Sequence, residues 1–400
     1  MTREEIRNDI LNINSPYILA ELPTSVGKTR VALDFMHEKE VEGNILIVIP
    51  RLILIDNWKK EFAKWGYEPY LPKVTFTTYI SLPKYAKGNV YDLVIFDECH
   101  HLSERAREAA EELISNYTLL LSATVNKTLK KEFKMLFPQL ECYKISMREA
   151  IEETILPDPE VFLIPLKLNE KKLTETMIIN PKAKGNIVDI TFASRFAARK
   201  NKNIKYRIEC TQHDYYSDLS AMVDFYKRNY FHTNNQAIYF RWQQKAKERL
   251  TWLSGLKNNV VLQLLEKLKD KRTLTFCNGI EQTKILGKYC INSKNTDSDS
   301  ILEDFNNEKI NHITACNILN EGANLTNCQV GIFVSINSSD TMRIQKLGRI
   351  LRHENPKIFI IYYENTREEE LVQEMLENYN SELITVVNNL EELNGNKNMF

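Results

Sequence analysis

Short apolar segments alternate with amphipathic segments along the first part of the chain. The apolar segments are nearly continuous in valine, isoleucine and leucine, and they lie at residues 17–22, 45–49, 74–77, 93–96 and 119–122. Continuous apolar strands are typical of parallel sheets that are covered on both faces. The segments between them have helical spacing, as at residues 30–38, 55–64 and 104–115. This alternation predicts an α/β domain with a parallel sheet over residues 1–150.

A second alternating set follows after a segment of different character. An amphipathic helix is expected at residues 260–268, and strands are expected at residues 273–276, 313–318, 330–335 and 358–363. They predict a second parallel-sheet domain over residues 256–370. Residues 151–255 are expected to form an accessory, largely helical linker region, and residues 371–400 a helical tail. The fold class is therefore α/β, with two tandem domains.

Composition narrows the class of protein without identifying a ligand. The 400 residues carry 53 basic and 53 acidic side chains, so net charge favours neither nucleic acid nor membrane. We find no apolar run near the roughly 20 residues that a membrane helix needs, and no signal-peptide core. The seven cysteines contain no C-x-x-C pair, and His213, His232 and His312 lack metal-ligand spacing. A cytoplasmic protein without a membrane partner is expected.

Residues 22–29, LPTSVGKT, have the strand-before and helix-after context of a phosphate-binding loop. Backbone N–H groups and the helix N-terminus can bind phosphates there, and Gly27 allows close approach of the backbone. Lys28 is suited to the β and γ phosphates and Thr29 to Mg²⁺. Thr24 and Ser25 belong to the same loop, whose first position is Leu22 instead of glycine. The alternative is an ordinary strand–turn–helix with a surface lysine.

Residues 94–102, VIFDECHHL, place two carboxylates after an apolar strand. Ligands of open α/β sheets bind at the carboxyl ends of the strands. Asp97 is suited to holding Mg²⁺ through water, and Glu98 to orienting or deprotonating the attacking water. The alternative is a polar loop, but a nearby phosphate loop favours the catalytic interpretation.

These motifs occur in an order that resembles superfamily-2 helicases and translocases of the DExH-box type. LPTSVGKT, DECH, the triplet Ser122-Ala123-Thr124 and QKLGRILR at 345–352 resemble motifs I, II, III and VI. Further matches are IPRLILIDNW at 49–58, TFTTY at 75–79, TFCNGIEQ at 275–282 and NEGANLTNC at 320–328. The resemblance covers residues 16–124 and 260–365. It implies two RecA-like domains that bind ATP and Mg²⁺ in the cleft between them.

The resemblance also implies roles for single residues. Arg349 and Arg352 would reach the γ-phosphate from the second domain, where a guanidinium can stabilise phosphoryl charge. Gln345, Gly322 and Asn324 would lie at the nucleotide or the domain interface. Ser122 and Thr124 would couple ATP to domain closure. Contacts to the nucleic-acid backbone are expected from Arg51, Thr78 and Asn278.

The substrate is narrowed further by details of the motifs. The LPTS opening, Asn57-Trp58 and the GANL of residues 322–325 resemble DNA translocases, namely UvsW-type DNA helicases, which are the nearest, and chromatin-remodelling motors. This favours DNA over RNA. An RNA helicase and an ATP-switched nucleic-acid-binding protein stay open as alternatives, as does strand separation against duplex translocation. A monomer is compatible with the sequence, which does not determine the oligomeric state.

A basic stretch lies outside these motifs. Residues 191–207, TFASRFAARKNKNIKYR, contain basic residues and no acid. One hypothesis is a nucleic-acid contact through Arg195, Arg199 and Lys200, because phosphates attract such side chains. The other is a solvated helix and loop whose aromatic residues pack inward.

Overall fold

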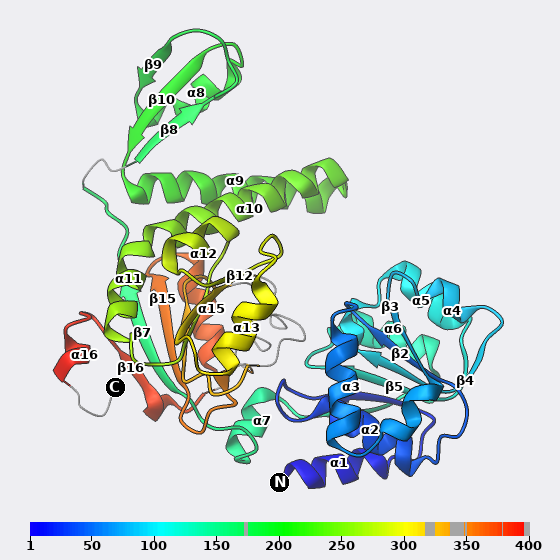
Figure 1. Ribbon diagram of the computed structural model, residues 1–400. Coiled ribbons are helices and arrows are strands. Elements are labelled where there is room, and N and C mark those ends of the chain that lie inside the picture. Colours follow the sequence, from blue (N-terminus) through cyan, green and yellow to red (C-terminus); the bar gives the residue numbers. More distant parts are fainter. Residues whose placement is uncertain (172–174, 317–324, 337–347, 349, 378, 396–400) are drawn as a thin grey trace.

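A computed structural model describes residues 1–171, 175–316, 325–336, 348, 350–377 and 379–395. In this part of the chain two parallel sheets carry separate sets of helices, and a small third sheet lies apart from them (Figure 1). No helix among these residues has the length and apolar character needed to cross a membrane.

The first sheet has six parallel strands in the order β3-β2-β4-β5-β1-β6. The strands are β1 (Tyr17–Glu21), β2 (Ile45–Ile49), β3 (Val74–Thr78), β4 (Val90–Asp97), β5 (Ile114–Ser122) and β6 (Glu141–Lys144). The five strands expected from the sequence are confirmed. The helix expected at 104–115 ends earlier, because residues from Ile114 onward pair with β4 as the start of β5.

Helices cover both faces of this sheet, which explains its continuous apolar strands. Ile45, Ile47 and Ile49 pack on one face with α1 (Arg3–Leu11), α2 (Lys28–Glu38) and α3 (Leu54–Lys64). Leu46 and Val48 pack on the other with α4 (Pro83–Ala86), α5 (Glu104–Glu111) and α6 (Lys127–Leu136). Successive residues of a strand point to opposite faces, so both sets must be apolar. The domain is doubly wound, and its continuous apolar strands predicted that both faces of the sheet are covered.

The second sheet has seven parallel strands in the order β12-β13-β11-β14-β15-β7-β16. Its strands are β7 (Glu160–Leu166), β11 (Thr273–Phe276), β12 (Cys290–Ile291), β13 (His312–Ala315), β14 (Val330–Phe333), β15 (Lys357–Tyr363) and β16 (Ile384–Val386). One face packs on α11 (Asn258–Lys267) and α12 (Ile280–Leu286), the other on α13 (Ser298–Asn306) and α15 (Arg367–Leu376). A short helix, α7 (Met147–Glu152), lies before β7, and α16 (Glu392–Gly395) lies near the end of the described chain.

Two of the expected boundaries differ from this arrangement. Strand β7 belongs to the second sheet although its residues fall in the expected middle region, and it pairs with β15 along its whole length. Strand β16 pairs with β7 from within the expected helical tail. Neither assignment follows from local sequence, because a strand's sheet is determined by its distant partners.

The middle region is less helical than expected. Strands β8 (Glu175–Ile179), β9 (Ile187–Ile190) and β10 (Lys205–Cys210) form the small sheet, with α8 (Arg195–Lys200) packed against it. The side chains of β9 are largely exposed, so this strand lacks an apolar signature. Two long antiparallel helices follow, α9 (Gln212–Thr233) and α10 (Gln236–Leu256), and they lie between the small sheet and the second parallel sheet (Figure 1).

Candidate active site

The loop between β1 and α2 has the conformation of a phosphate-binding loop. Helix α2 begins at Lys28, and its N-cap, Gly27, has φ of 113°. Ser25 also has a positive φ, 76°. This backbone places the free N–H groups of the α2 N-terminus at the carboxyl edge of the sheet, where they can bind an anion.

Leu22, which replaces the usual first glycine, lies outside the bend of the loop. Its side chain is fully buried in the core, and its backbone N–H donates to the Ser122 carbonyl at 2.9 Å. The position therefore continues the sheet edge and does not require a positive φ. The departure from the glycine pattern lies before the turn that carries Gly27.

The two carboxylates at the end of β4 face the loop. Lys28 Nζ lies 3.0 Å from Glu98 Oε1. Glu98 has φ of 53° and ψ of 55°, a left-handed conformation that is costly for a residue with a side chain and is concentrated at functional sites. Trp58, from α3, donates from Nε1 to Asp97 Oδ2 at 3.1 Å. Burial, with the adjacent Glu98 carboxylate, raises the pKa of Asp97 to about 6, while Lys28 and the Trp58 hydrogen bond act in the opposite direction.

His100 connects the carboxylates with the expected coupling triplet. Its Nδ1 lies 3.0 Å from Ser122 Oγ and 3.4 Å from Glu98 Oε2. Ser122 is buried and its Oγ donates to the Thr124 carbonyl at 2.8 Å. Sequence reasoning assigned no role to His100 or to the contact of Trp58 with Asp97. The DECH motif was a signal for His100, but its contact with Ser122 depends on the pairing of β4 with β5.

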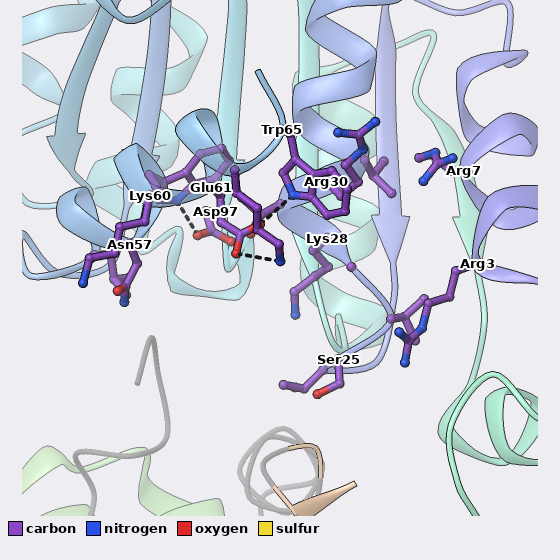
Figure 2. Close-up of a pocket in the computed structure, with 18 of the residues that line it drawn as sticks. Arg3, Arg7, Ser25, Lys28, Arg30, Asn57, Lys60, Glu61, Trp65 and Asp97 are labelled. Atoms are coloured by element: carbon purple, nitrogen blue, oxygen red, sulfur yellow. Dashed lines mark hydrogen bonds and ion pairs between the residues drawn. The ribbon is translucent and has the colours of Figure 1, made fainter. Parts of the chain in front are cut away.

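A cavity of about 610 Å³ opens over these groups, a size that ligand sites commonly have. Figure 2 shows side chains from α1, the loop, α2 and α3 around it. Its lining is rich in cations and includes Arg3, Arg7, Lys28, Arg30, Lys60, Lys64 and Arg352. Thr24 Oγ1 is buried there without a hydrogen-bond partner among the described residues. Many cations, an unsatisfied hydroxyl and a helix N-terminus fit a polyphosphate such as ATP. The Thr29 hydroxyl and the Asp97 carboxylate lie in the same cavity and provide the oxygen ligands that Mg²⁺ prefers.

The second domain reaches this cavity through Arg352. Its Nε donates to Ser25 Oγ at 3.1 Å, and Ser25 Oγ donates to the Gly348 carbonyl at 2.6 Å. The expected site residues Gly322, Asn324, Gln345 and Arg349 lie outside the described residues.

The expected nucleic-acid contacts lie at the carboxyl ends of strands. Thr78 ends β3 and pairs with Ile49 of β2, so the exposed Arg51 follows at the neighbouring strand end. Asn278 follows β11 in the second domain, and its Nδ2 donates to Thr251 Oγ1 at 2.9 Å. The structure therefore brings Arg51 and Thr78 to one edge and places Asn278 on the other domain.

Two arginines of the basic stretch pair with a carboxylate of the protein itself. Arg195 Nε donates to Asp218 Oδ1 at 2.9 Å, and Arg199 forms an ion pair with the same buried carboxylate. The Arg195 guanidinium also lies 3.6 Å from the Phe192 ring centroid. These two arginines attach α8 to α9, because a buried carboxylate needs compensating cations. Lys200 is exposed.

Comparison with known proteins gives matches over both domains. Residues 3–127 match the family "Type III restriction enzyme, res subunit", and residues 256–354 match "Helicase conserved C-terminal domain". The "DNA 3'-5' translocase XPB2" of Sulfurisphaera tokodaii is 24% identical over 361 residues, which cover 85% of this chain and 76% of that protein.

The fold has solved relatives. A variant of S. cerevisiae Dbp5 bound to RNA and ADP BeF3 has a TM-score of 0.61 at 9% identity, covering 98% of this chain and 92% of that one. S. cerevisiae Dbp5 bound to the same ligands has a TM-score of 0.58 at 10% identity, covering 100% and 92%. The two parallel sheets, with their helices, thus form two RecA-like domains in tandem.

Proposed function

We propose that this superfamily-2 helicase uses ATP hydrolysis in the cavity between its two RecA-like domains to move along DNA. The two family matches and the fold make the chain an ATP-dependent enzyme of the helicase class. The observation that carries the mechanism is the position of Arg352, a residue of the second domain that lines the same cavity as Lys28 and Glu98.

The phosphates of ATP compete with Glu98 for Lys28. The amine and the carboxylate are 3.0 Å apart, so binding of Lys28 to a phosphate oxygen changes the partner of Glu98. Glu98 then accepts the proton of the water that attacks the γ-phosphorus, the bond to the bridging oxygen breaks, and ADP and phosphate leave. Arg352 stabilises the charge that spreads over the transferred group.

Mg²⁺ would be held by Thr29 and, through water, by Asp97. The ion would neutralise charge on the β and γ phosphates when it is bound. Trp58 positions Asp97 by its hydrogen bond, so this carboxylate is oriented before the ion arrives.

DNA is favoured over RNA by the relative that is described as a DNA translocase. The LPTS and GANL segments agree with this and with a DExH-box protein of the UvsW type. The roles of Arg51, Thr78 and Asn278 in backbone contact, a monomeric state and a cytoplasmic location stay predictions.

A stimulated ATPase panel tests this proposal. Turnover with Mg²⁺ is measured alone and with single-stranded DNA, duplex DNA, forked DNA and RNA at one stated salt concentration, because backbone binding depends on salt. We expect stimulation by DNA that exceeds stimulation by RNA. Folded protein that binds ATP without turnover on any of them would instead be an ATP-switched binding protein, and stimulation by RNA alone would make it an RNA helicase.

A further inference from the structure

The joined end of α9 and α10 carries a cluster of aromatic side chains that no part of the proposed mechanism uses. Tyr230 and Phe231 lie on the last turn of α9, and Tyr239, Phe240 and Trp242 lie near the start of α10. The Tyr230 ring centroid is 5.1 Å from that of Tyr239 and 6.0 Å from that of Trp242. We call these five residues the aromatic tip.

Packing between the helices accounts for only part of this cluster. Tyr230, Tyr239 and Trp242 are half-buried, which suits rings that hold the two helices together. Phe231 and Phe240, by contrast, are 70% and 68% exposed. Burial of a phenylalanine contributes about 2 kcal/mol, so two rings that stay mostly exposed do not serve the stability of the hairpin. An apolar patch of this kind indicates a binding surface.

No residue of the described part of the chain buries Phe231 or Phe240. Buried residues of α9 end at Val223 and those of α10 begin at Leu253, so the base of the hairpin packs on the second domain while residues 224–252 include no buried residue. Figure 1 shows the two helices side by side, with their joined end away from the small sheet.

Charge around the tip identifies the kind of partner. Residues 224–249 contain six lysines and arginines and two acids, in a chain whose net charge is zero. Lys227 precedes Phe231 by four residues, and Lys247 follows Phe240 by seven, so each exposed lysine shares a helix face with an exposed phenylalanine. An aromatic ring can stack on a base while a neighbouring cation binds the adjacent phosphate, and proteins bind single strands by this combination.

The base of the hairpin lies at an expected nucleic-acid contact. Thr251 of α10 accepts a hydrogen bond from Asn278 Nδ2 at 2.9 Å, and Ser254 Oγ donates to Gln282 Oε1 at 2.8 Å. A helix rises 1.5 Å per residue, so Phe240 lies about 16 Å along α10 from Thr251. A strand that leaves Asn278 can therefore reach the tip within a few nucleotides.

We infer that the aromatic tip is a binding site for an unpaired nucleic-acid strand, in which Phe231 and Phe240 stack on bases and Lys227 and Lys247 bind the flanking phosphates. The inference rests on the proposed function only in one respect, which is that the bound strand is taken to be a strand along which the protein moves. A duplex offers base faces only at its ends, so the site selects unpaired bases.

The test measures binding of a labelled 20-nucleotide single strand and of a blunt duplex by fluorescence anisotropy, with the full-length protein. Phe231→Ala/Phe240→Ala is expected to weaken single-strand binding about tenfold or more and duplex binding less than twofold, since each base stack contributes substantially. Phe231→Leu/Phe240→Leu should lose as much, whereas Phe231→Tyr/Phe240→Tyr should bind like the wild type. Met135→Ala, which removes an 81% exposed apolar side chain from α6, is the matched control and should change nothing.

The lysine variants should differ from the phenylalanine variants in the salt dependence of single-strand binding. Lys227→Ala/Lys247→Ala should reduce the slope of log affinity against log salt by about 1.4 for a single strand, and the phenylalanine variants should leave it unchanged. Equal single-strand binding by the Phe→Ala double variant and the wild type would overturn the inference, as would equal losses on strand and duplex. A leucine variant that binds normally, or a variant that only abolishes self-association in sedimentation, would show a protein-docking surface instead.

The outcome for the motor is separate. If the wild type shows DNA-stimulated turnover and the Phe→Ala variant binds single strands normally, the tip site is refuted and the proposed motor function stands. If the Phe→Ala variant loses single-strand binding and the wild type shows no DNA-stimulated turnover, the tip site stands and the proposed motor function is refuted.

Discussion

Arg352 and Ser25 are 327 residues apart in the chain, yet Arg352 Nε donates to Ser25 Oγ at 3.1 Å. The contact joins the second domain to the phosphate loop of the first. Because Ser25 Oγ also donates to the Gly348 carbonyl, the loop holds this segment of the second domain at two points. Ser25 of this loop thus forms part of the domain interface.

Loss of the Arg352 guanidinium should affect turnover far more than ATP binding. We expect Arg352→Ala to lower kcat about a thousandfold, because an arginine that reaches the transferred phosphate contributes this much. Steady-state ATPase assays and binding of a labelled nucleotide measure the two effects. Arg105→Ala, at an exposed site on α5, is the control. A kcat within threefold of the wild type would refute the catalytic role.

Glu98 should be needed for hydrolysis and dispensable for binding. Glu98→Gln keeps the size of the side chain but removes the base, so kcat should fall by a factor of about 100 or more. ATP should bind at least as tightly, because Lys28 loses the carboxylate that holds it. Glu104→Gln, at an exposed position on α5, should keep normal turnover. The role of Glu98 is wrong if the glutamine variant turns over like the wild type.

Gly348 makes a close approach that a side chain would prevent. A Cβ there would lie 2.3 Å from Thr24 Cβ, well inside van der Waals contact. Gly348→Ala should therefore disturb the contact of the domains and lower kcat tenfold or more. Gly255→Ala is a matched helical control, since nothing lies within 4 Å of its added Cβ. Thr24→Gly removes the clashing atom, so Gly348→Ala should lower kcat less in the Thr24→Gly protein than in the wild type. An equal loss of kcat in both proteins would argue against the clash.

A buried ion pair lies in the core of the second domain. Lys257 Nζ donates to Glu368 Oε1 at 2.6 Å and to the carbonyls of Val334 and Ile361, and burial lowers the pKa of Lys257 while Glu368 acts in the opposite direction. Lys257→Met should lower the free energy of unfolding by about 3–5 kcal/mol, because Glu368 stays buried without its cation.

The double variant Lys257→Met/Glu368→Gln supplies the control for this pair. It should lose less than the single variant, since the glutamine carries no charge and can still accept from the Tyr363 N–H. Urea unfolding of both variants measures the difference. A double variant that is less stable than the single one would show that charge isolation is not the cause.

His312 should make stability depend on pH. Burial lowers its pKa to about 4, below the usual 6.5, so the folded protein keeps the ring neutral between these values while the unfolded chain takes up a proton. Its contribution is complete above the unfolded pKa and is lost as the pH falls. Between pH 7 and pH 5 we expect a loss of about 2 kcal/mol from this residue.

His312→Gln should remove that part of the pH dependence. The amide can still face Thr275 Oγ1, which lies 3.0 Å from His312 Nε2, and it does not titrate. Urea unfolding of the wild type and the variant at both pH values measures the difference. Identical slopes of stability against pH in the two proteins would contradict the assignment.

Local patterns were sufficient for much of the fold and for the centre of the site. Residues 45–49 and 93–96 had to be strands because their apolar side chains need partners on both faces. Gly27-Lys28-Thr29 lies between a strand and a helix, and that context is the one that predicts a phosphate loop. These features depend on neighbours in sequence, so the sequence by itself determined them.

Tertiary structure decided the features that join distant residues. The sequence does not indicate that β7 enters the second sheet, that Asp218 takes Arg195 and Arg199, or that His100 meets Ser122. The contact of Arg352 with Ser25 belongs to the same class. Each depends on which surfaces pack together, and the free energy of that packing is shared among many residues far apart in the chain. A basic stretch therefore looks the same in sequence whether it binds phosphates or a buried carboxylate, and only the folded chain distinguishes them.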